Sequence, residues 1–76
     1  MNFQHGTAIY TTRAIADRDA GSAGLDLYCE AGGQPKCVAR IAFWDASGQF
    51  AFQTFKEIPL VVVEELIAEA KQTIKT

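Results

Sequence analysis

The chain has 76 residues, of which 49% are apolar and 21% are charged, and this balance is typical of a folded globular domain and excludes disorder. We expect a single small globular domain over residues 1–76, because the length leaves no room for a second one. The formal net charge of -2 provides no overall attraction to nucleic acid or to an anionic membrane surface. A chain this short buries only about 60% of the surface that its unfolded form exposes, so self-association is expected to add stability.

The beginning of the sequence lacks the features of a targeting signal. Residues 1–6 have neither the basic nor the apolar region of a signal peptide, and no apolar run is long enough to span a bilayer. We therefore expect a cytoplasmic protein with no membrane partner. Cys29 and Cys37 are too few for a disulfide scaffold and lack the spacing of a zinc site, so we expect both to be reduced and buried.

Four segments have the composition and alternation of β-strands, at residues 7–15, 25–30, 37–44 and from 49 to about 57. The segment 16–24 is rich in Ala, Asp and Gly and is predicted to be a long loop. Turn chemistry is found at residues 30–36 and 45–48. Pro59 suits the first turn of a helix, and apolar residues at helical spacing (Val63, Leu66, Ile67, Ala70 and Ile74) predict an amphipathic helix from about residue 59 to 75.

The predicted fold class is therefore α+β: a four-stranded antiparallel meander with one C-terminal amphipathic helix packed on one face. This order of elements resembles that of the Whirly-type single-stranded-DNA-binding regulators. The resemblance implies a fold that dimerises through its helices. It is a likeness of element order, without the basic motifs of that family, and it transfers no residue to this sequence.

The predicted turns set the registers of the strands and hence their faces. A three-residue loop ending at Gly48 would place Asp45 opposite Gln49 and Trp44 opposite Phe50. Pairing Cys29 with Cys37 would place Leu27 opposite Ala39 and Asp26 opposite Arg40. On the helix-covered face these registers put Leu25, Leu27, Ala39, Ile41, Phe43, Ala51 and Phe55. The opposite face would then hold Asp26, Tyr28, Val38, Arg40, Ala42, Trp44, Phe50, Phe52, Thr54 and Lys56.

The second face is the predicted interface or ligand face, because one helix covers only one side of a sheet and leaves aromatic side chains on the other. Its candidate residues are Tyr28, Arg40, Trp44, Phe50, Phe52 and Lys56. The leading hypothesis is a homodimer or higher homo-oligomer closed by this face, alone or with Val61 and Val62, which are expected to be exposed on the helix. One alternative is single-stranded DNA or RNA stacked on the aromatic side chains. The other is a small ligand bound at the dimer interface.

No group of residues has the pattern of a catalytic site. His5 is the only histidine, and we expect it to lie in a mobile N-terminal segment without a nucleophile beside it. The spacing of Asp17 and Asp19 resembles the beginning of a calcium-binding loop, but the bidentate glutamate of such a loop is absent. The helix carboxylates are expected to form a solvated face: Glu64, Glu65 and Glu69. The sequence therefore predicts a non-enzymatic interaction module that binds no metal and no cofactor.

Overall fold

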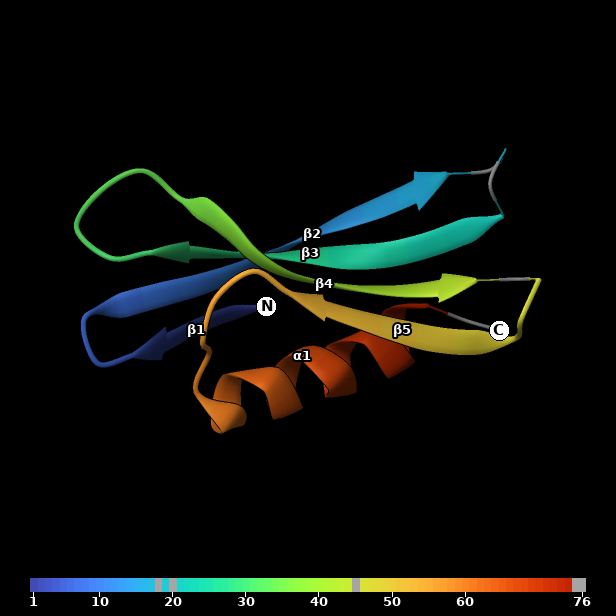
Figure 1. Cartoon of the computed structure of the whole chain (residues 1–76). Helices are drawn as coiled ribbons and strands as arrows, with labels where there is room; N and C mark the ends of the chain where they lie inside the picture. The colour runs from blue at the N-terminus through green and yellow to red at the C-terminus, as the bar shows by residue number, and fades with distance from the viewer. Residues whose placement is uncertain (18, 20, 45, 75–76) are drawn as a thin grey trace.

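The computed structural model describes residues 1–17, 19, 21–44 and 46–74. The elements in chain order are β1 (Asn2–His5), β2 (Ala8–Asp17), β3 (Ser22–Glu30), β4 (Lys36–Trp44), β5 (Gln49–Thr54) and α1 (Leu60–Thr73). The strands form one antiparallel sheet in sequence order, and α1 lies along one face of it (Figure 1). The α+β class with a C-terminal helix is confirmed, but the sheet has five strands instead of four. No helix in the described part of the chain is long and apolar enough to cross a membrane.

The additional strand, β1, pairs with β2 through a two-residue turn. His5 lies opposite Ala8, and Gly6 between them has a φ of 63°. A glycine with positive φ at the first turn position matches the right-handed twist of a hairpin. The expectation of a mobile N-terminal segment was therefore wrong, since His5 belongs to the sheet. A four-residue strand at the end of a chain has too short a pattern to be recognised by alternation.

The predicted loop at 16–24 is largely strand. Asp17 pairs with Ser22 at the end of a long hairpin, and Gly24 lies within β3. A Cβ atom at Gly24 would stand 2.3 Å from the backbone oxygen of Ile41. This glycine therefore permits the close approach of β4 and does not mark a turn. The prediction failed because a glycine needed for close contact has the same sequence signal as one needed for a bend.

The core lies between α1 and the centre of the sheet. Val62, Leu66 and Ala70 of α1 are fully buried, and they pack on side chains of β3 and β4. The core residues from these two strands are Leu25, Leu27, Cys29, Val38, Ala39 and Ile41. The helix begins at Leu60 after Pro59, as predicted, whereas the predicted end at residue 75 lies outside the described residues.

The buried stripe of the helix is rotated from the predicted one. Val62 was expected to be exposed and is fully buried, whereas Val61 is 44% exposed as expected. Val63 and Ile67 are only partly buried. Because adjacent helical positions are about 100° apart, the stripe beginning at Val62 turns Val63 and Ile67 toward the border of the contact.

A β-bulge in β4 changes the faces at one end of the sheet. Leu27 lies opposite Ala39, but the next pair is Tyr28 with Cys37, so Val38 is the additional residue and joins the core at 2% exposure. The predicted pairs of Asp26 with Arg40 and of Leu27 with Ala39 are confirmed. The pairing of Cys29 with Cys37 was wrong, because Cys29 faces Lys36. Both thiols are free; Cys29 is buried, whereas Cys37 is partly exposed.

The register of β5 differs by one residue from the prediction. Trp44 pairs with Gln49 and Phe43 pairs with Phe50, so the connecting loop has four residues, 45–48. The N–H of Gly48 donates to the carbonyl oxygen of Trp44 at 2.8 Å. A slip of one residue moves every side chain of a strand to the other face. Phe50 and Phe52 therefore lie on the helix side and Ala51 on the helix-free side, the reverse of the expectation, and the predicted place of Asp45 lies outside the described residues.

Candidate functional site: the β5 surface and the helix-free face

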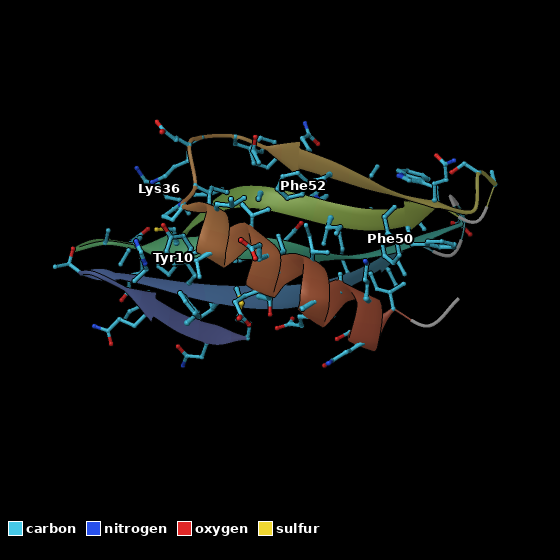
Figure 2. The ribbon with its side chains drawn as sticks, turned by 90° about the horizontal axis from the view of Figure 1, so that it is seen from below. Tyr10, Lys36, Phe50 and Phe52 are labelled. Carbon is cyan, nitrogen blue, oxygen red and sulfur yellow. The ribbon has the colours of Figure 1, made fainter. Side chains whose placement is uncertain are left out.

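The last strand of the sheet is exposed along its whole length. All six residues of β5 are accessible to solvent, although Phe50 and Phe52 point to the helix side of the sheet. These two side chains are 38% and 44% exposed. Figure 2 looks onto this side and shows Phe52 between α1 and β5, with Phe50 nearer the C-terminal end of the helix. We call the open backbone edge of β5 together with Phe50 and Phe52 the β5 surface.

The β5 surface carries none of the usual protections of an edge strand. Natural edges are blocked by charged side chains, proline or a bulge, and β5 has neither a charged residue nor a proline. Its pairing with β4 proceeds without a register shift. The ring of Phe50 packs edge-on against that of Phe43, with ring centres 5.2 Å apart, and this contact holds the Phe50 side chain in place on the β5 surface. Apolar exposure continues nearby at Phe55, Leu60 and Val61.

The first five of the six residues of β5 form a symmetric sequence. Gln49-Phe50-Ala51-Phe52-Gln53 is the same in both directions. The N–H of Phe55 donates to the carbonyl oxygen of Val38 at 2.9 Å, so this residue directs its backbone groups toward β4. Backbone groups alternate along an antiparallel strand, and the alternation directs those of Phe50 and Phe52 to the open edge. The edge therefore offers a symmetric row of donors and acceptors.

The helix-free face is polar and centred on a buried carboxylate. Asp26 is 6% exposed and accepts two hydrogen bonds from Arg40, at 2.5 Å from Nε and 3.2 Å from Nη2. The hydrogen bond from Arg40 to Asp26, followed by the charge of that carboxylate, raises the pKa of Arg40. On the other side of Asp26, the guanidinium of Arg13 lies 5.1 Å from the centre of the Tyr28 ring. This row is a charged, partly aromatic strip across three strands.

The six predicted interface residues are divided among three places. Tyr28, Arg40 and Trp44 share the helix-free face, as expected. Phe50 and Phe52 do not join them, because the register of β5 places both on the helix side. Lys56 follows β5 and lines a pocket with Lys36, a residue that the sequence did not single out. No periodicity could have paired these two lysines, because they come from segments that meet only in the folded sheet.

The carboxylate of Glu69 joins α1 to the first two strands. It lies 2.6 Å from the Met1 ammonium, and it accepts a hydrogen bond from the Thr12 hydroxyl at 2.6 Å. The same ammonium donates to Thr12 at 2.9 Å. Burial of Glu69 would raise its pKa, but the hydrogen bonds from Met1 and Thr12 and the charge of the ammonium outweigh it and lower the pKa. Glu69 was expected to be solvated, and the structure shows a half-buried ion pair instead.

In the part of the chain that the structure describes, no three His, Cys, Asp or Glu side chains are grouped so that they could hold a metal ion. Comparison with protein-family models, with characterised proteins and with solved structures finds no match. A function must therefore be inferred from the surfaces of the molecule itself.

Proposed function

We propose that this protein is a non-enzymatic interaction module that forms a two-fold homodimer by pairing β5 with the β5 of a second copy. The observation that carries the proposal is the exposed, uncharged and symmetric edge strand from Gln49 to Gln53. An edge of this kind favours addition of another strand. The small size of the chain supports the same conclusion, since small domains gain stability from a partner.

The symmetry of the strand selects one register. In a two-fold antiparallel pair centred on Ala51, this residue lies opposite its own copy, and Phe50 of one chain lies opposite Phe52 of the other. Gln49 then lies opposite Gln53 on the helix-free face. Aromatic side chains meet aromatic side chains and amides meet amides, and each pairing occurs twice. No charged side chain of β5 opposes this register.

The proposed dimer is one continuous sheet formed from two five-stranded halves. The two-fold axis of an antiparallel strand pair of this kind is perpendicular to the sheet, so both copies of α1 would lie on the same face. The Phe50 and Phe52 side chains of both chains would fill the space between the helices, which supports their placement at the centre of an interface. This interface differs from the helix-free face expected from the sequence because the register of β5 differs.

The register can be tested with charge substitutions at the two-fold axis. Ala51→Lys and Ala51→Glu each place two like charges opposite one another, while their side chains point to the helix-free face and away from the core. Each variant alone should dimerise at least about fivefold more weakly than the wild type, and an equal mixture of the two should recover the affinity through opposite charges. Analytical ultracentrifugation at low ionic strength measures all three samples.

Ala68→Lys is the matched control, because Ala68 is exposed on α1 outside the β5 surface. It should dimerise as the wild type does. The proposal would be wrong if the wild-type chain stayed monomeric at high concentration. It would also be wrong if Ala51→Lys dimerised with unchanged affinity, because no dimer centred on Ala51 tolerates that repulsion without loss.

Single-stranded nucleic acid is the alternative partner, and the Arg13 guanidinium over Tyr28 together with the exposed Trp44 favours it. Because Phe50 and Phe52 lie on the helix side, only Tyr28 and Trp44 of the four predicted aromatic side chains are on the helix-free face. Titration of a fluorescent oligothymidylate at low and moderate salt tests this partner. Binding that falls with salt and is lost in Tyr28→Ser and Trp44→Ser would favour it, whereas no binding at low salt would exclude it.

A further inference from the structure

A pocket at one end of the sheet is not used by the proposed dimer interface. It has a volume of about 530 Å³ and lies between the β3–β4 loop and the chain that leaves β5. Its lining includes Gly32, Gly33, Lys36, Val38, Phe55 and Lys56. The volume is within the range of about 300 to 1,000 Å³ that small-molecule sites occupy.

The bulge in β4 lies beside this pocket. The additional residue, Val38, turns its side chain into the core, and its carbonyl oxygen accepts the hydrogen bond from Phe55 that holds the end of β5 against β4. Residues on both sides of the bulge thus line the hollow together with the β3–β4 loop. Gly32 and Gly33 belong to this loop, and a Cβ atom added to either would meet no atom within 4 Å.

The pocket combines two positive charges with an apolar wall. Lys36 at the start of β4 and Lys56 after the end of β5 both line the hollow, and Figure 2 shows Lys36 at the same end of the sheet as Tyr10. Neither lysine takes part in an ion pair with another described residue. The accessible apolar surface of the pocket is mainly the half-exposed ring of Phe55, because Cys29 and Val38, which also line the hollow, are buried. Two cations that line one hollow without an ion pair favour the binding of an anion there.

We infer that this pocket binds a small organic anion with an apolar or aromatic body, such as an aromatic sulfonate, carboxylate or phosphate. The anionic group contacts Lys36 and Lys56, and the body packs on the ring of Phe55. The charge alone does not account for such a site, because exposed lysines are well hydrated. The apolar wall selects a ligand that gains from burial as well as from charge.

The test uses two probes of similar shape, naphthalenesulfonate and the uncharged naphthalenemethanol, with inorganic sulfate as the anion without a body. Titrations of the wild-type chain are followed by amide shifts in NMR spectra. We expect the sulfonate to bind at least about tenfold more tightly than the other two, and to shift the signals of Gly32 and Gly33. The double variant Lys36→Gln with Lys56→Gln should lose about tenfold in affinity for the sulfonate.

Lys71→Gln is the matched control, since Lys71 is exposed on α1 and does not line the pocket. It should bind the sulfonate as the wild type does. Phe55→Ser should weaken the binding of both the sulfonate and the neutral probe. A far-ultraviolet circular dichroism spectrum of each variant tests whether it is folded. Equal affinity for the charged and neutral probes would overturn the inference. Unchanged binding by the double variant, or shifts confined to the β5 surface, would do so too.

The inference does not rest on the dimer. Lys36 and Lys56 lie outside the symmetric segment from Gln49 to Gln53. An Ala51→Lys chain should therefore bind the sulfonate as the wild type does, whether or not β5 forms the interface. The NMR titrations test the pocket and the ultracentrifugation tests the dimer, so a negative result for one proposal is distinguishable from a negative result for the other.

Discussion

The strands β3 and β5 have a similar alternation of apolar residues, but these side chains are buried in β3 and exposed in β5. Leu25 and Leu27 in β3 are 2% and 0% exposed, whereas Phe50 and Phe52 in β5, on the same face of the sheet, are 38% and 44% exposed. The strand β3 has a neighbour on both sides and α1 above it, but β5 has one neighbour and lies beyond the helix. Burial here depends on position in the sheet and not on the hydrophobicity of the strand.

The comparison also explains why β5 is the candidate interface. An aromatic pair in the centre of the sheet would contribute to the core and carry no information about partners. The same pair on an unprotected edge leaves its rings partly exposed and its backbone groups without a partner strand, and a second strand would cover the rings and pair the backbone groups. The following variants test whether β3 supports the fold and β5 supports association.

The largest expected effect is that of Leu27→Ala, which removes a fully buried side chain beneath α1. We expect a loss of about 3 kcal/mol in the free energy of unfolding, since the cavity adds to the lost transfer energy. Phe52→Ala should change the unfolding free energy of the isolated monomer by no more than about 0.5 kcal/mol. Urea titrations of dilute protein measure both. Equal losses would show that β5 is part of the monomer core.

A second contrast compares two glycines. Gly24→Ala brings a Cβ atom to within 2.3 Å of the Ile41 carbonyl oxygen, and this backbone atom moves only with β4. We expect a loss of about 2 kcal/mol in unfolding free energy. Gly33→Ala meets open space and should be neutral or slightly stabilising, because it lowers the entropy of the unfolded chain. Thermal unfolding monitored by circular dichroism separates the two, and a tolerated Gly24→Ala would contradict the close packing of β3 on β4.

The ion pair of Glu69 should make stability depend on pH. Its pKa is lowered in the folded chain, so its contribution is complete above the unfolded value, near 4.5, and is lost as the pH falls through the folded value. Solvent screening reduces the effect to about 0.5 kcal/mol. In the Glu69→Gln variant, the free energy of unfolding should therefore decrease less below pH 4.5 than in the wild type. Urea unfolding over a series of pH values measures this difference. Glu65→Gln is the control, since Glu65 is exposed, and its free energy of unfolding should depend on pH as that of the wild type does.

The smallest expected effect separates the two faces of the sheet. Trp44→Ala should change the dimer dissociation constant by less than about twofold, because Trp44 lies on the helix-free face. Phe52→Ala should raise that constant tenfold or more, as expected for an aromatic side chain at the centre of an interface. Sedimentation velocity over a concentration series measures both. The opposite ranking would return the interface to the face that the sequence alone favoured.

Local patterns in the sequence predicted much of the fold. Alternation located β3 and β4, and Pro59 marked the beginning of α1. The pair of Asp26 with Arg40 was predictable because one register satisfies both the apolar face and the opposite charges. The thiols of Cys29 and Cys37 were mispaired, since nothing in the composition of Lys36–Ala39 announces that Val38 is an additional residue.

The sequence by itself located the beginning of the helix and the central parts of four of the five strands, because backbone propensity and periodicity act over a few neighbouring residues. Only the tertiary structure decided which of their apolar residues are buried. The loop at 45–48 is one residue longer than predicted, and this single residue exchanges Phe50 and Phe52 with Ala51 between the faces. Likewise, Lys36 and Lys56 line one pocket because the folded sheet places the start of β4 beside the chain that leaves β5. Register and bending arise from contacts between distant segments, and for this reason no local pattern encodes them.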